Sequence, residues 1–246
     1  MKLGFKISLI VLALSALGFG QHHRRGGISL PEPPKSGPFF LPLSKSDWQG
    51  FCQGGDPCTR NFLSNNSAAG DLEFAFPVYD DPKPCNVDDC PSVNYLFAPA
   101  GSGWPQRSPL VITGYSTIQA TFQITVTGNP VFFYQTDLDN TCVSPASVRL
   151  FLWQWDDAET GADRWWSNPV SYQLAPGATT LSVALTPDQW SDVAGQTGTE
   201  DPQGFADALN NINFVGMTFG GGCFFGHGVS VSGGTAEFHL AGYSLQ

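Results

Sequence analysis

The most constraining feature of this chain is a series of short segments in which apolar and polar side chains alternate. In residues 121–127, Phe122, Ile124 and Val126 occupy every second position, with threonine and glutamine between them. Successive side chains of a β-strand point to opposite faces, so a period of two is typical of a strand with one buried face. Such segments recur through the second half of the chain and predict an antiparallel β-sandwich.

Turn-forming residues separate these segments and leave little room for helices. The 246 residues include 28 Gly and 19 Pro, and 13% are aromatic, which argues against a helical bundle or a coiled coil. Short helices are expected only at residues 186–190, where Thr186 precedes Pro187, and at 205–209. Strands are expected at residues 71–76, 93–97, 121–127, 131–134, 148–152, 171–174, 181–185, 214–219, 229–231 and 235–240.

The N-terminal segment is typical of export. Residues 1–20 combine two lysines, an apolar run too short to span a bilayer and a Gly-Phe-Gly end, which predicts a signal peptide. An uncleaved anchor is the alternative. Residues 21–38 are expected to form a flexible, Pro-rich spacer, and residues 39–246 a single sandwich domain. The mature protein is therefore expected to have no membrane span and to be secreted, extracellular or periplasmic.

Six cysteines fit an oxidising compartment and predict three disulfides. We favour pairs that close short loops within the irregular N-terminal part of the domain, which leaves one long bridge that would stabilise the fold by about 4 kcal/mol. A metal site or a catalytic thiol is the alternative, but no C-x2-C pair is present. The expected pairs are Cys52–Cys58, Cys85–Cys90 and Cys142–Cys223.

One predicted strand carries an unusual row of aromatic residues. In residues 147–155 the even positions are aliphatic up to Gln154, as suits a core face, and the odd positions are Arg149, Phe151, Trp153 and Trp155. Rings beside hydrogen-bonding groups suit sugars, whose C–H faces stack on rings while their hydroxyls need polar partners. The alternative is that both faces of this strand are buried.

Other candidates for binding residues lie outside this strand. The indoles of Trp165 and Trp166 follow the next turn and would add to the same face or its rim, and Glu237 and His239 alternate with apolar residues on the last strand. His227, between two glycines, is either a ligand contact or a locally hydrogen-bonded turn residue.

Charge and motifs exclude several function classes. The formal net charge of −10 argues against a nucleic-acid partner, because phosphate binding needs a basic surface. The Gly-rich loop around Cys223 lacks the ending of a phosphate loop, and no EF-hand or nucleophile-elbow motif is present. Asp137 and Asp139 lie two residues apart, a spacing that would allow a shared calcium ion. No cofactor and no metal site are predicted.

The C-terminal half resembles the galactose-binding-domain-like jelly rolls. The resemblance rests on Trp190, on apolar positions from Phe205 to Phe219 and on the final run Ala236 to Leu245. It covers residues 114–246 and implies a jelly-roll sandwich like that of many carbohydrate-binding modules of secreted proteins, with the concave sheet face and its loops as the binding region. The family's last strand often carries an acidic pair tied to a structural calcium, but Ala241-Gly242 stands there instead.

Together these features predict a secreted, non-catalytic protein that binds an extracellular oligo- or polysaccharide on an aromatic and arginine sheet face. Two alternatives remain. The chain is a structural or adhesive protein that docks a protein partner, or it is a jelly-roll glycan hydrolase or lyase whose carboxylate pair the sequence does not identify. The sequence does not determine the oligomeric state or the glycan.

Overall fold

The computed structural model describes residues 37–53, 62–66, 71–80, 91–99, 109–134, 145–154, 163–221 and 225–246. All of them belong to one compact unit, Glu32–Gln246. The predicted signal peptide and nearly all of the predicted spacer lie outside the described residues, and the domain bounds stay a prediction. Within the described residues, no helix is long and apolar enough to cross a membrane.

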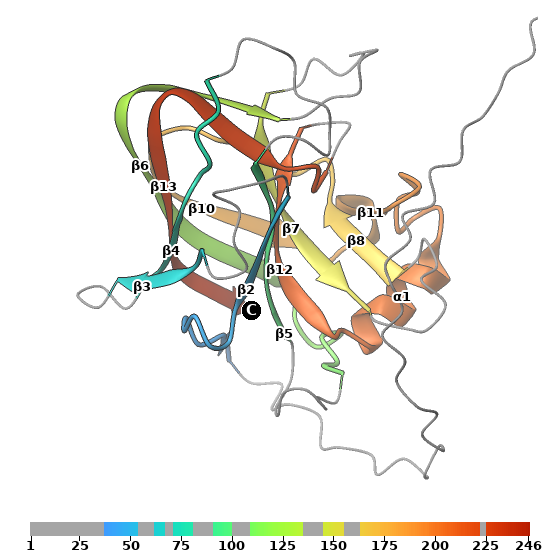
Figure 1. The fold of residues 1–246 in the computed structure, drawn as a ribbon. Coiled ribbons are helices and arrows are strands. Elements are labelled where there is room, and N and C mark those ends of the chain that lie inside the picture. Colours follow the sequence, from blue (N-terminus) through green and yellow to red (C-terminus); the bar gives the residue numbers. More distant parts are fainter. Residues whose placement is uncertain are drawn as a thin grey trace, which may run out of the picture. The chain divides into compact units, whose positions relative to one another are not determined.

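Strands dominate the unit and confirm the predicted all-β, antiparallel jelly-roll sandwich (Figure 1). A single α-helix, α1, is present in the described part of the chain, together with short 3₁₀ turns such as η2. The elements are β1 Phe39–Phe40, β2 Gln49–Gln53, β3 Ser64–Asn66, β4 Asp71–Ala75, β5 Ser92–Pro99, β6 Thr117–Tyr134, β7 Ser147–Trp153, β8 Arg164–Ser167, β9 Tyr172–Gln173, β10 Gly177–Ala184, η2 Pro187–Gln189, β11 Trp190–Asp192, α1 Pro202–Asn210, β12 Phe214–Gly220 and β13 Val229–Leu245.

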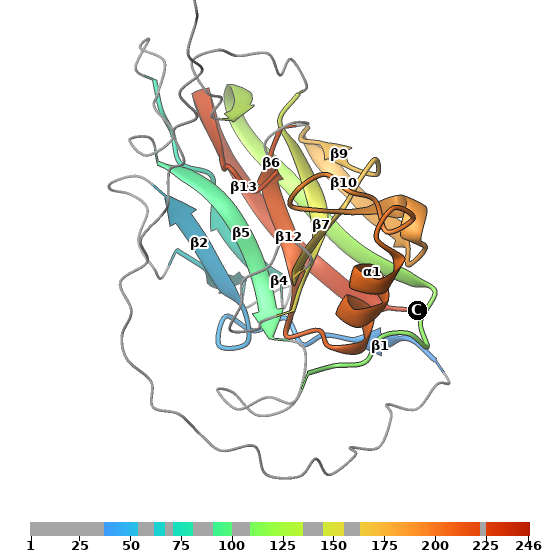
Figure 2. The ribbon, with the colours of Figure 1, turned by 90° about the vertical axis from the view of Figure 1, so that its right-hand side faces the viewer.

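The strands form one continuous sheet in the order β10-β6-β13-β5-β12-β7-β8-β11, which folds back on itself into two layers. One layer contains β2, β5, β12, β7 and β8. Figure 2 shows β2, β5, β12 and β7 of this layer side by side. The other contains β10, β6, β13, β4 and β3. The long strand β13 joins the layers, because its start borders β5 and its later part pairs with β4.

Two pairs of predicted strands are in fact single long strands. Pro130 was expected to end one strand, and residues 229–231 and 235–240 to be separate, yet β6 and β13 each run through. The pairing register of β6 and β13 shifts between Ser232 and Gly234, opposite the segment that contains Pro130, and the strands stay paired on both sides of it. A second shift lies between Leu240 and Gly242. A bulge of this kind lets a proline that lacks an N–H remain within a paired strand.

The core lies between the layers and is rich in stacked rings. Phe238 of β13 stacks on Phe122 of β6 and on Phe74 of β4, with ring centroids 4.9 and 5.2 Å apart. The edge of Phe219 from β12 in the facing layer approaches the same ring at 5.4 Å. The even positions of β7, Val148, Leu150 and Leu152, are fully buried in this core, as their alternation predicts.

The helix α1 contains the expected segment 205–209 but begins earlier, at Pro202, after the capping residue Asp201. The carboxylate of Asp201 accepts a hydrogen bond from the backbone N–H of Gly204 at 3.0 Å, and Pro202 occupies the first turn. Its apolar side, which includes Phe205, packs beside Trp165 of β8.

Candidate functional site

The layer built on β5, β12 and β7 has a second side-chain face that points away from the core. Leu96, Met217 and Leu150 are paired across these strands and point into the core. Their neighbours Tyr95, Thr218 and Arg149 are likewise paired, and alternation places them on the opposite face.

We call this second surface the aromatic face. Three rows of paired residues cross it, and strands β2 and β8 extend it at either side. Its ring-bearing residues come from five strands, whereas the sequence analysis identified rings from β7 and β8 alone. The aromatic face consists of Phe51, Tyr95, Phe97, Phe151, Trp153, Trp166 and Phe214, with Gln49, Arg149, Arg164 and Thr218 as its polar members.

The rings form one contiguous cluster. Trp153 and Phe214 lie 5.1 Å apart between centroids with their planes tilted by 37°, and Phe97 meets Phe214 edge-on at 5.4 Å. Phe151 lies 5.5 Å from Tyr95 and 5.2 Å from Trp166. Rings from four adjacent strands therefore make a single apolar surface.

The prediction that the row on β7 is open to solvent is wrong for its inner members. Arg149, Phe151 and Trp166 are only 5%, 1% and 3% exposed. They are buried because rings of neighbouring strands flank them and Phe225 packs against both Arg149 and Trp166. Trp153 keeps partial exposure, and Trp155 lies outside the described residues.

The exposed part of the aromatic face lies toward β2 and around Trp153. Phe51 is 51% exposed, and Phe97 and Phe214 are half-buried. Gln49 is exposed and Arg164 is half-buried at the two sides of this region. Rings and hydrogen-bonding side chains are therefore accessible together.

Trp165 is not part of this face. Its side chain is fully buried and lies 5.1 Å from the ring of Phe205 in α1. The prediction that it joins the aromatic row is wrong, because it is paired with Leu152 and therefore points to the core side of β8.

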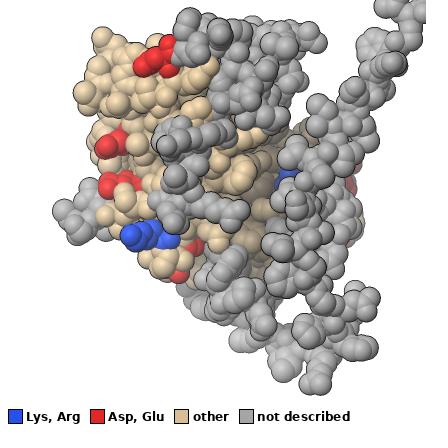
Figure 3. All heavy atoms as spheres, in the orientation of Figure 1, with Lys and Arg blue, Asp and Glu red and all other residues tan. Residues whose placement is uncertain are grey.

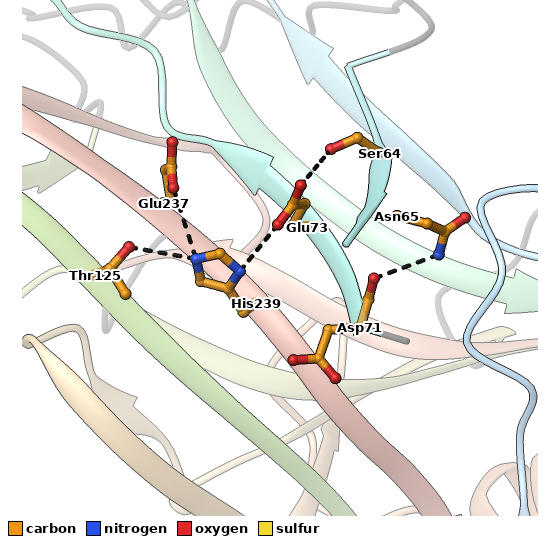
Figure 4. Close-up of polar contacts among 7 residues, drawn as sticks. All are labelled: Ser64, Asn65, Asp71, Glu73, Thr125, Glu237 and His239. Atoms are coloured by element: carbon orange, nitrogen blue, oxygen red, sulfur yellow. Dashed lines mark hydrogen bonds and ion pairs between the residues drawn. The ribbon is translucent and has the colours of Figure 1, made fainter. Parts of the chain in front are cut away.

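Glu237 and His239 point outward, as predicted, but from the other layer. Figure 4 shows the His239 ring between Glu73 and Glu237 on the outer face of β4 and β13. Its Nδ1 lies 3.2 Å from Glu73, and its Nε2 lies 3.7 Å from Glu237 and 3.3 Å from the Thr125 hydroxyl. The expectation that they stand beside the aromatic row is wrong, because the part of β13 that carries them pairs with β4 and β6 in the opposite layer.

The polar interior of the aromatic face is incompletely paired. The guanidinium of Arg149 donates to the Ser147 hydroxyl at 2.9 Å and to the Gly221 carbonyl at 3.3 Å, and lies 4.5 Å from the centre of the Phe225 ring. Its Nε has no hydrogen-bond partner, and the same is true of Thr218 Oγ1 and Trp166 Nε1. Burial lowers the pKa of Arg149 to about 10.

We expect an Arg149→Met variant to be more stable than the wild type, with a free energy of unfolding about 1 kcal/mol higher. The reason is that a buried cation without a carboxylate partner is replaced by an apolar side chain of similar length. The folded-state pKa of Arg149 lies below its usual value, so the cost of the buried charge is present at neutral pH and is relieved as pH rises through about 10. Urea unfolding at about pH 7 and about pH 10 measures both effects. A loss of stability at neutral pH would contradict this prediction.

No metal centre is present among the described residues, where no group of three metal-ligating side chains converges. Asp137 and Asp139 lie outside them. Cys52 is disulfide-bonded, but the other five cysteines are not among the described residues, so their pairing stays a prediction. His227 is exposed in the turn after Phe225.

Seven members of the aromatic face were missed by the sequence analysis, namely Gln49, Phe51, Tyr95, Phe97, Arg164, Phe214 and Thr218. The signal for Phe97 was present: Tyr95 and Phe97 alternate with Leu96 and Ala98 in the predicted strand, just as the rings alternate with aliphatic residues on β7.

Fold and site together define a jelly-roll β-sandwich with an aromatic outer face. No family model matches the chain, and no curated protein matches it. Two solved structures are similar in outline. A "xylan-binding module CBM15" is 11% identical, with 85% of this chain and 96% of that chain covered and a TM-score of 0.37. A β-glucanase of Bacillus licheniformis is 12% identical, with 86% and 98% covered and a TM-score of 0.38. Likeness this weak indicates nothing about the function of this chain.

Proposed function

We propose that this protein is a secreted, non-catalytic carbohydrate-binding protein whose site is the exposed part of the aromatic face. The observation that carries the proposal is the group of accessible rings, Phe51, Phe97, Trp153 and Phe214, on a sheet face that takes no part in the core. A sheet face open to water normally carries polar residues.

The chemistry of the face supports a saccharide ligand. The apolar C–H face of a sugar ring stacks on an aromatic ring, and its hydroxyls need donors and acceptors close by. Trp153 offers the largest ring, and Phe214 lies against it at 5.1 Å. Gln49 brings an amide that both donates and accepts, and Arg164 brings a planar set of donors beside Trp153.

We expect Trp153→Ala to weaken polysaccharide binding at least about tenfold, because one stacking ring accounts for roughly 1.4 kcal/mol. A glycan array identifies the ligand, and isothermal titration with that ligand measures the loss. Phe40→Ala is the matched control, since this ring is 66% exposed on β1 of the other layer. Near-ultraviolet circular dichroism verifies that both variants are folded.

The outcomes separate the alternatives. Unchanged glycan binding in Trp153→Ala would remove the aromatic face as the site. Concentration-dependent self-association that the substitution abolishes, with no glycan retained, would indicate a protein-docking surface instead. Release of reducing ends that is lost in Glu237→Gln would indicate a hydrolase acting on the opposite layer.

A further inference from the structure

The positive charges of the described residues are concentrated on the aromatic face. The basic residues among them are Lys45, Arg149 and Arg164, and both arginines belong to this face. No described residue of the face carries a carboxylate. The whole chain has a formal net charge of −10, and few basic groups are visible on the described surface in Figure 3. The described residues of the aromatic face therefore carry positive charge, whereas the protein as a whole is acidic.

Buried polar atoms without partners lie beneath the same face. Arg149, Thr218 and Trp166 are each more than nine-tenths buried, and each has one unpaired atom. Arg149 and Thr218 are directly paired across β7 and β12, and Trp166 is paired with Phe151 on the neighbouring strand. Buried polar atoms are normally satisfied. Two N–H donors and a hydroxyl are therefore left unpaired beneath the aromatic face, which keeps its interior polar.

Arg164 brings the second charge to the accessible region. It is half-buried, it is paired with Trp153, and no carboxylate forms an ion pair with it in the described part of the chain. Its positive charge partly offsets the burial that raises the pKa of Tyr95, so the guanidinium lies within electrostatic range of that hydroxyl. The pairing of Arg164 with Trp153 places its side chain on the same side of the sheet as the ring cluster.

We propose that the ligand is an anionic polysaccharide whose charge is carried by uronic acid carboxylates, bound with a carboxylate at Arg164 and attracted in addition by the buried positive charge of Arg149 beneath the face. This inference rests on the carbohydrate-binding function proposed above. A neutral sugar would leave both guanidinium groups without a counter-charge, whereas a planar carboxylate matches the paired N–H donors of an arginine.

The test compares polygalacturonate and alginate with their fully esterified, neutral forms by isothermal titration. We expect the wild type to bind at least one free acid about tenfold or more tighter than its ester, with an affinity that falls as salt is added. Arg164→Gln should abolish this preference by weakening binding of the free acid much more than binding of the ester, and Arg164→Lys should restore part of it. Lys45→Gln, which removes an exposed charge on a loop before β2, should change neither affinity.

The possible results distinguish failure of the anionic-ligand proposal from failure of the carbohydrate-binding proposal. Equal affinity for acid and ester, both weakened by Trp153→Ala, would overturn the anionic ligand and keep the carbohydrate site. Binding of neither polymer would overturn the anionic ligand, and the glycan array would then decide the carbohydrate site. Tighter binding of dextran sulfate than of either uronate polymer would overturn the carboxylate assignment.

Discussion

A Phe238→Ala variant is expected to lose about 3–5 kcal/mol of its free energy of unfolding, the loss typical of a large ring removed from a well-packed core. Phe238 has no exposed surface and lies at the centre of the aromatic core. Its ring stacks on Phe74 and Phe122 and meets the edges of Phe76 and Phe219, so four rings lose a neighbour at once. Those rings belong to several strands and cannot all collapse into the space.

Urea or thermal unfolding measures the loss. Phe40→Ala is the control, because the same substitution at a ring that is 66% exposed should change stability by less than about 0.5 kcal/mol. If the two variants were equally stable, the stacked core described above would be wrong.

Gly216→Ala is expected to be at least as damaging, with a loss of about 3 kcal/mol or more, because the added methyl group meets backbone and not a movable side chain. A Cβ at this position would overlap the carbonyl oxygen of Leu96 and lie 2.6 Å from the Cα of Phe97. Gly216 is in β12, which pairs with β5 on one side and β7 on the other. The Tyr243 hydroxyl also donates to its carbonyl at 3.2 Å. Any shift therefore disturbs both ladders and a buried hydrogen bond.

Gly242→Ala provides a matched control on a strand. A Cβ there would meet Thr121 at 3.8 Å, which is ordinary van der Waals contact. We expect this variant to unfold within about 0.5 kcal/mol of the wild type. Gly216→Ala and Gly242→Ala are compared by their yield of soluble protein and by hydrogen exchange of the β12 amides. Equal protection of these amides in both variants would show that β5 and β12 do not approach as closely as described.

Periodicity was sufficient to predict most strands and their core sides. The even residues of β7 and the alternation in β6 correctly indicated which side chains point into the core, because a strand with one core face must repeat every second residue. Several short strands were missed. β1, β8 and β11 have two to four residues, which is too few for a pattern to emerge.

The candidate site was predicted only in part. Trp153 was identified from its strand, whereas Phe51 and Phe214 were not, since each belongs to a segment far from it in sequence. The burial of Phe151 and Trp166 was also unpredictable, because it depends on Tyr95 and Phe225, brought in from other strands and turns.

The sequence by itself therefore determined the class of fold, the turns and the inward side of the main strands, because these follow from local periodicity and from the conformational preferences of glycine and proline. The tertiary structure alone decided which side chains share the aromatic face and which of them reach solvent. It also separated Glu237 and His239 from that face by placing β13 in the opposite layer. The physical reason is that strand pairing joins distant segments, and the exposure of a ring is a property of its neighbours in space.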